Sequence, residues 1–97
     1  MTEDATEAVR DNPSAHRYEL TVDGHVAFIA YKPMPDGLVF VHTEVPEALG
    51  GRGVGGRLVS GALTDMRRRG LKVRPDCSFV AAYAERHPEF NDVIVGR

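Results

Sequence analysis

Alternating polar and apolar residues predict three consecutive strands after a polar start. Residues 16–22 (HRYELTV) alternate with a period of two, which is typical of a strand with one buried face. An Asp-Gly pair then predicts a tight hairpin, and residues 25–32 (HVAFIAYK) predict a second strand. After a turn rich in proline and glycine, residues 38–45 predict a third. Short turns between successive strands indicate an antiparallel meander.

A helical period follows at residues 54–66 and begins within a stretch that holds five glycines, at positions 50, 51, 53, 55 and 56. The apolar residues recur at intervals of three and four on one helix face: Val54, Leu58, Val59, Ala62, Leu63 and Met66. Three arginines at 67–69 and Gly70 then predict the helix end, because cations suit the negative end of the helix dipole and glycine suits the cap. The arginine run is interpreted as a solvated helix end rather than a nucleic-acid contact.

The last third of the chain predicts a short strand and a second, shorter helix. Residues 71–74 form the expected strand, which a proline ends. A strand, a helix and a strand in this order imply a crossover, so the new strand is expected to lie parallel to the third. Residues 77–87 predict the helix, capped by Ser78 or Asp76, and residues 89–97 a loosely packed tail. The predicted fold class is α/β (α+β), with the meander followed by glycine loop, helix, parallel strand and short helix.

Length and charge favour one small domain with no nucleic-acid partner. The chain has 97 residues, of which 42% are hydrophobic. Residues 1–13 hold four acidic residues against one arginine and predict a mobile acidic tail, so the single domain is expected over residues 14–97. The remaining 11 basic and 10 acidic residues nearly balance, which is too weak a charge to favour nucleic acid.

Several classes of protein and site are excluded or disfavoured by composition. No apolar run is long enough to span a membrane and the N-terminus lacks the features of a signal peptide, so a cytoplasmic location is expected. A single cysteine, Cys77, excludes an internal disulfide and a multi-cysteine metal site. His16, His25 and His87 lack the spacing of metal ligands, so no metal is expected. A monomer or weak homodimer is the expected state.

The loop at residues 49–56 (LGGRGVGG) lies between a strand and a helix start, a recurring arrangement for binding phosphate groups. Backbone N–H groups and the positive end of the helix dipole both face an incoming anion there. A nucleotide-triphosphate P-loop ends in Gly-Lys-Ser/Thr, but this loop continues as Gly-Arg-Leu. The dinucleotide fingerprint G-x-G-x-x-G matches at Gly51, Gly53 and Gly56, with Asp76 placed 20 residues further on. An antiparallel meander precedes the match, whereas that fingerprint belongs in a parallel fold.

The element order resembles the core of the GNAT superfamily of acyl-CoA N-acyltransferases. Two stretches, HTEVPEALGGRGVGGRLV and LKVRPDCSFVAAYAERHPEF, look like a group of very small GNAT-like proteins, and the resemblance covers residues 16–92. It implies a truncated GNAT-like core that binds coenzyme A with the pyrophosphate on the loop amides. The expected cofactor contacts are Val45, Gly51, Arg52, Gly53, Val54, Gly55, Gly56 and Arg57. The superfamily's arginine or glutamine position falls on Gly50, and Arg52 or Arg57 is expected to substitute.

Acyl transfer to an amine needs a base for the amine, donors for the oxyanion and an acid for the leaving thiolate. The resemblance implies a general base at the end of the third strand, where Glu44 lies, and strand alternation puts His42 on the same face as an alternative. Cys77 lies at the expected start of the second helix, where the helix dipole favours a thiolate. The resemblance implies a catalytic cysteine, as acyl acceptor or as acid. Tyr83 is a second candidate acid; all four residues also fit purely structural roles.

These observations lead to two functional hypotheses. The first is a minimal N-acetyltransferase that moves acetyl from acetyl-CoA to an amine, for example an exposed lysine of a protein or peptide. The second is a coenzyme A-binding or protein-interaction module on a GNAT scaffold without catalysis. Fold class does not separate them, because function resides in the site.

Overall fold

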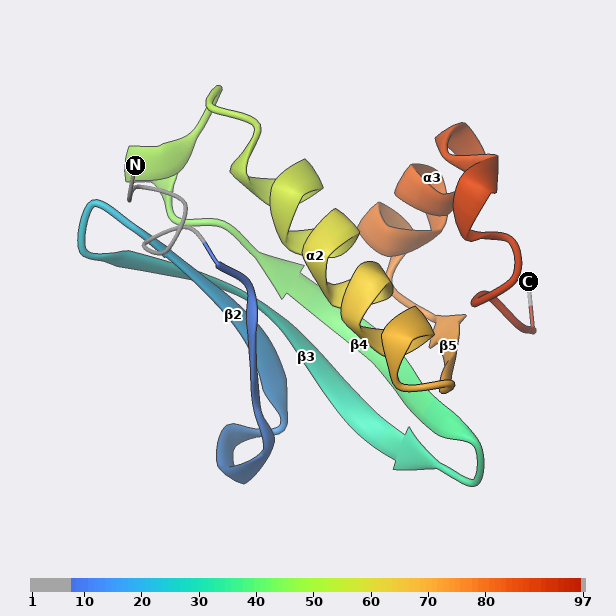
Figure 1. Cartoon of the computed structure of the whole chain (residues 1–97). Coiled ribbons are helices and arrows are strands. Elements are labelled where there is room, and N and C mark those ends of the chain that lie inside the picture. Colours follow the sequence, from blue (N-terminus) through green and yellow to red (C-terminus); the bar gives the residue numbers. More distant parts are fainter. Residues whose placement is uncertain (1–7, 97) are drawn as a thin grey trace.

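Residues 8–96, which the computed structural model describes, form a five-stranded sheet with two α-helices on one face (Figure 1). The sheet order is β1-β2-β3-β4-β5, and β1 to β4 are antiparallel while β5 runs parallel to β4. The predicted α+β fold, including the parallel last strand, is confirmed. The elements are β1 (Arg10–Asn12), β2 (Arg17–Val22), β3 (His25–Met34), β4 (Gly37–Glu44), α2 (Val54–Arg68), β5 (Lys72–Pro75) and α3 (Ser78–Arg86).

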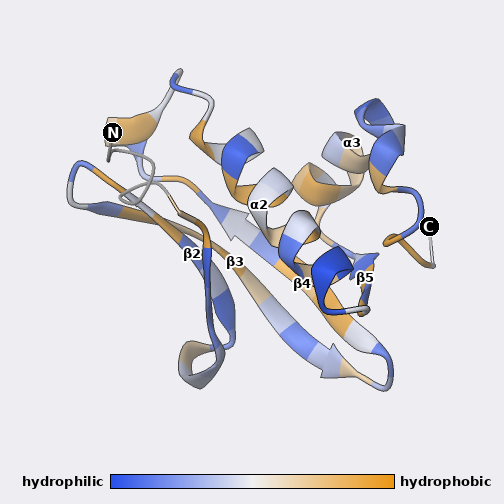
Figure 2. Ribbon diagram, viewed as in Figure 1, coloured by the Kyte–Doolittle hydropathy of each residue, from blue (hydrophilic) through white to orange (hydrophobic). Residues whose placement is uncertain are grey.

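The core lies between α2 and the sheet. All six apolar residues that the helical period placed on one face of α2 are buried. They pack on the inward residues of β2 and β3, and along β2 these alternate with polar residues, as a strand with one buried face requires (Figure 2). Leu58 and Leu63 are fully buried, and each such side chain contributes about 1.5–3 kcal/mol through the area it removes from water.

The N-terminal acidic segment is partly incorporated in the sheet. β1 pairs with β2, with Asp11 opposite Tyr18, where composition predicts a mobile tail. The expectation is therefore wrong for residues 10–12, and residues 1–7 lie outside the described part of the chain. A physical reason is the fit of Val9 onto Gly61 of α2, where a Cβ would lie 2.4 Å from the valine side chain. A strand of three residues is too short to show a period in the sequence.

The C-terminal segment packs firmly, in contrast to the loose tail expected over residues 89–97. Phe90, Val93 and Ile94 are buried, and Ile94 forms a parallel bridge with Val73 of β5. A short 3₁₀ helix at Pro88–Phe90 opens this segment, and within residues 8–96 others lie at Pro13–Ala15 and Glu47–Leu49. The segment covers the outer side of β5 and shields the core there.

The arginine run does end α2, as predicted, but two of its side chains also bind other segments. Arg67 pairs with Asp92 at 2.8 Å and lies over the Phe90 ring, with 5.0 Å from the guanidinium carbon to the ring centroid. Arg69 pairs with Asp11 at 3.0 Å. Arginines at the C-terminal end of α2 therefore bind both β1 and the segment that follows α3.

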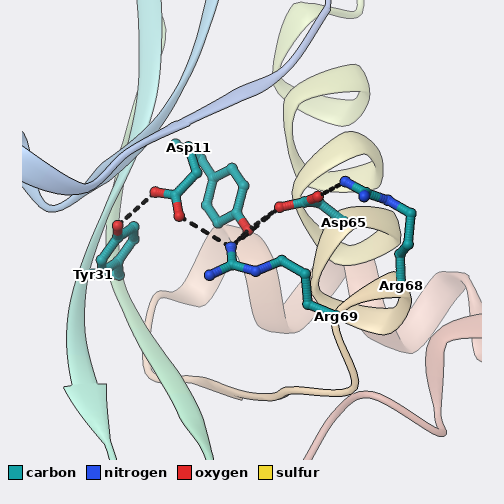
Figure 3. A network of polar contacts seen from close by, with 6 residues as sticks. Asp11, Tyr31, Asp65, Arg68 and Arg69 are labelled. Atoms are coloured by element: carbon teal, nitrogen blue, oxygen red, sulfur yellow. Dashed lines mark hydrogen bonds and ion pairs between the residues drawn. The ribbon is translucent and has the colours of Figure 1, made fainter.

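A polar network joins β1, β2 and β3 to the last turns of α2 (Figure 3). The Tyr31 hydroxyl donates to Asp11 Oδ1 at 2.5 Å, and the Tyr18 hydroxyl donates to Asp65 Oδ2 at 2.7 Å. Arg69 also reaches Asp65 and the Tyr18 hydroxyl. Burial and the hydrogen bond to Asp65 raise the pKa of Tyr18. Burial alone would raise the pKa of Asp65, but the hydrogen bonds from Tyr18 and Arg69 lower it below its ordinary value.

Asp65→Asn is expected to lower the free energy of unfolding at pH 7 by about 1–2 kcal/mol, because it removes charged hydrogen bonds to Tyr18 and Arg69. A carboxyl group whose pKa is lower in the folded than in the unfolded protein stabilises the folded state at any pH above its unfolded pKa. This stabilisation is lost as the pH falls through the pKa of the folded state. Urea unfolding of wild type and variant should therefore converge at acidic pH. Asp92→Asn, at an exposed pair, is the matched control with a smaller effect. An equal deficit of Asp65→Asn at neutral and acidic pH would contradict this account.

Candidate functional site

The outer edge of β4 loses its strand partner halfway along the strand. β5 pairs with β4 only from Gly37 to Phe40. The N–H of Cys77 then donates to the Phe40 carbonyl at 2.9 Å, and the chain turns into α3. Within residues 8–96, the stretch 41–44 therefore has β3 on one side and no strand on the other. Such an edge offers backbone donors and acceptors to an extended ligand.

A β-bulge decides which side chains of β4 face the helices. The register between β3 and β4 shifts between Ala30 and Tyr31, which leaves Val41 as an extra residue. The bulge reverses the alternation, because a one-residue insertion moves each later side chain to the other face. Phe40 is buried beneath the helices, and Thr43, three residues later, also lies on the helix side.

Thr43 contacts Cys77 across the end of the β4–β5 pairing. Its Oγ1 lies 3.3 Å from the Cys77 Sγ. Cys77 is 8% exposed and is the N-cap residue of α3, in place of the predicted Ser78 or Asp76, and its side chain makes no capping bond. The thiol thus lies at the positive end of a helix and beside a hydroxyl group. The sequence did not single out Thr43, because its position depends on the bulge.

The two candidate bases lie on the opposite side of β4. His42 Nε2 is 2.9 Å from Glu44 Oε1, which confirms that they share a face, and both side chains are about 60% exposed, at 60% and 59%. Glu44 lies opposite Phe28 in the register between β3 and β4, and the Phe28 ring contacts the His42 ring. This is the sheet face that the helices leave open (Figure 1). Cys77 and the His42–Glu44 pair are therefore separated by the strand.

The glycine loop presents an uncapped helix N-terminus. Gly51 and Gly53 have φ of 75° and 71°, a left-handed backbone that favours glycine. α2 begins after Gly53 with no side-chain cap and no acidic residue in its first turn. The N–H of Arg57 is the first to reach back along the helix, at 3.1 Å from the Gly53 carbonyl. The N–H groups of residues 54–56 have no acceptor within the helix, as at any helix start.

Gly55 serves a different purpose, which is close packing against α3, whereas Gly56 leaves room for a Cβ. A Cβ on Gly55 would lie 2.7 Å from Phe79 Cζ and 3.5 Å from Val45 Cγ2. A Cβ on Gly56 would lie 3.7 Å from the Tyr83 ring. Gly55 therefore lets the Phe79 ring of α3 approach the first turn of α2.

The Tyr83 side chain of α3 packs against the first turn of α2 and against the segment that follows α3. Its ring stacks on His87 with centroids 3.9 Å apart and lies near Phe90. Cys77, by contrast, contacts β4 through Thr43. The two predicted acids thus have different surroundings.

The loop arginine expected to bind phosphate has an internal partner. Arg52 pairs with Asp23 of the β2–β3 turn at 2.9 Å, and both side chains are largely exposed. The backbone at Gly50 is extended, with φ of −61° and ψ of 144°. Arg57 is exposed on the first turn of α2. A ligand anion at the loop would thus meet Arg52 already oriented by the hairpin turn.

Residues 8–96 contain no group of three or more His, Cys, Asp or Glu side chains placed to hold a metal ion. No helix in that range is long and apolar enough to cross a membrane.

Comparison with known proteins assigns the family. The profile of the family described as GCN5-related N-acetyl-transferase matches residues 17–93. The chain belongs to this family. The solution NMR structure of a GCN5-like candidate N-acetyltransferase from Staphylococcus aureus is similar, with 25% identity and a TM-score of 0.71 over 96% of this chain and 92% of that one. No curated protein matches this chain significantly. The minimal GNAT core that the sequence suggested is therefore confirmed.

Two glycine substitutions test how the loop is built. Gly53→Ala is expected to lower the free energy of unfolding by about 1–2 kcal/mol, because it forces a Cβ into the left-handed region. Gly56→Ala, in ordinary helical backbone with open contact distance, is expected to raise it by about 0.5–1 kcal/mol. Chemical denaturation of both variants measures the difference. Equal effects would mean that the backbone conformation at the helix start is not what selects glycine.

Proposed function

We propose that this chain is an N-acetyltransferase that uses acetyl-CoA as acyl donor. Coenzyme A would lie along the free edge of β4, with its pyrophosphate at the amides of residues 51–56. The observation that carries this proposal is that β4 loses its partner after Phe40 beside both an uncapped helix start and a cysteine.

The charge and the free backbone N–H groups of the glycine loop suit a pyrophosphate. The first turn of α2 carries no acid, and its free N–H groups and dipole favour an anion. Arg52 would leave or share its partner Asp23 to reach a phosphate, and Arg57 lies one turn along the helix. These two arginines would replace the side chain that Gly50 lacks.

The free edge of β4 fits the amide groups of a pantetheine arm. Residues 41–44 offer N–H and C=O groups at strand spacing, and pantetheine carries two amides that can pair with them. The bound cofactor would supply the thioester that activates the acetyl group. At the inner end of this edge, Thr43 and Cys77 would adjoin the sulfur.

Acetyl transfer forms a bond between the acceptor nitrogen and the acetyl carbon and breaks the carbon–sulfur bond. The nitrogen must lose a proton, and the departing sulfur must gain one. We assign the first task to the His42–Glu44 pair, which shares a short contact and faces water. Cys77, held by Thr43, would supply the proton to sulfur or accept the acyl group first.

The open face of the sheet suits an acceptor presented by a larger molecule. The helices leave this face uncovered next to Glu44 and His42 (Figure 1). Both side chains are mostly exposed, so an extended or protein-borne amine can reach them without a closed pocket. An exposed lysine of a protein or peptide is the acceptor class we propose.

A second candidate function is coenzyme A binding without catalysis. One observation favours it: His42 and Glu44 lie on the opposite face of β4 from Cys77, and their exposure leaves a base in contact with bulk water. Under this alternative, the fold retains the cofactor site and uses bound coenzyme A in a protein interaction.

Calorimetry with acetyl-CoA, followed by acetyl transfer to a panel of amines, tests the proposal. Glu44→Gln should lower kcat/KM by about 10²- to 10⁴-fold, as loss of a general base does, with unchanged affinity for acetyl-CoA. Asp36→Asn, at the other end of β4, is the matched control and should keep full activity. Mass spectrometry for acetylated Cys77 separates a covalent route from direct attack.

The outcomes distinguish the candidates. Absence of acetyl-CoA binding would refute both functions. Binding without turnover, unaltered in Cys77→Ala, would support the non-catalytic alternative and contradict the enzyme.

A further inference from the structure

Among the described residues, two large apolar side chains are notably exposed, and only one of them lies at the proposed site. Val26, 38% exposed, follows the β2–β3 turn on the open face of the sheet. Phe79, 43% exposed, lies in the first turn of α3, two residues after Cys77. An exposed ring costs free energy in water unless a ligand or partner covers it, so the position of Phe79 is informative.

Phe79 reaches across from α3 to the start of α2. The ring comes so close to Gly55 that a Cβ there would lie 2.7 Å from Cζ and 3.2 Å from Cε2. The same point is 3.5 Å from Val45 Cγ2, just past the end of β4. Val45, Gly55 and Phe79 thus form an apolar corner between the helix start and the free edge of β4. We call it the Gly55 corner.

The Gly55 corner adjoins the proposed phosphate site, where the charged pyrophosphate of coenzyme A would give way to the uncharged pantetheine arm. Its glycine is one of the three residues whose N–H groups point out of the start of α2. In coenzyme A, the carbon that bears two methyl groups follows the phosphate oxygen after a single methylene. A phosphate at those N–H groups would therefore bring the dimethyl carbon to the adjoining apolar surface. That carbon is uncharged, branched and rigid, which suits an aromatic face and a valine methyl.

We propose that Phe79 and Val45 bind the dimethyl carbon of the pantetheine arm and so select phosphopantetheine ligands over other phosphates. This inference rests on the proposed coenzyme A site. Phe79 is thus a positioning and specificity residue. It holds the pantetheine arm where the arm passes from the start of α2 to the free edge of β4. Gly55 is part of the same device, because any side chain there would displace the ring.

Calorimetry with three probes tests the inference: coenzyme A, 4′-phosphopantetheine and adenosine 3′,5′-bisphosphate. Phe79→Ala should weaken the first two by the same factor, about 5- to 30-fold, because the dimethyl carbon no longer packs on an aromatic ring. It should leave adenosine 3′,5′-bisphosphate, which has no pantetheine arm, unchanged. Phe79→Leu should recover part of the affinity. Gly55→Ala should weaken the same two probes, because its Cβ displaces the ring.

Val26→Ala is the matched control, since it removes the other exposed apolar side chain and should change no affinity. Thermal unfolding of each variant checks that the fold is intact, and Phe79→Leu keeps the test informative if the alanine variant is unstable. Unchanged coenzyme A affinity in Phe79→Ala, or an equal decrease for all three probes, would overturn the inference while leaving the proposed function standing. Failure of the wild-type chain to bind coenzyme A would overturn both.

Discussion

The short pairing between β4 and β5 is the constraint on which the site depends. The two strands approach so closely at Gly37 that a Cβ there would lie 1.8 Å from the Lys72 carbonyl oxygen. The pairing then stops at Phe40, whose carbonyl accepts the N–H of Cys77 instead of a further strand residue. One hydrogen bond thereby ends the parallel ladder, exposes the rest of the β4 edge and fixes the cysteine at its inner end.

The bulge at Val41 determines on which face of β4 each candidate catalytic side chain lies. It directs Thr43 toward Cys77 and leaves His42 and Glu44 on the open face. A proton donor for sulfur and a base for nitrogen would then act from opposite sides of one strand. This arrangement requires donor and acceptor to meet at the strand edge, which is the place that the missing β5 partner leaves accessible.

Periodicity was sufficient to predict most of the fold. The strands β2 to β4 and the buried face of α2 follow from repeats of two and of three to four residues, and the parallel direction of β5 follows from the order strand, helix, strand. β1 was missed because three residues show no period, and the packing of Phe90 and Ile94 was missed because isolated apolar residues have none. These elements are held by long-range contacts, which a local pattern does not contain.

The sequence named candidate site residues but not how they are arranged. The sequence pointed to the glycine loop, Cys77, Glu44 and His42. It did not reveal Thr43, which depends on the bulge, or the contact of Phe79 with Gly55, which depends on the approach of two helices. It attributed the glycines from Gly51 to Gly56 to phosphate binding alone, whereas the structure also gives Gly55 a packing role against Phe79.

We propose above all that the free edge of β4 and the start of α2 together bind coenzyme A. Amide hydrogen exchange resolved by NMR, with and without coenzyme A, tests it most directly. Binding at this place should slow amide exchange at residues 41–44 and 51–56, with little change at β2. Protection confined to other segments, or unchanged exchange along the β4 edge at saturating ligand, would contradict it.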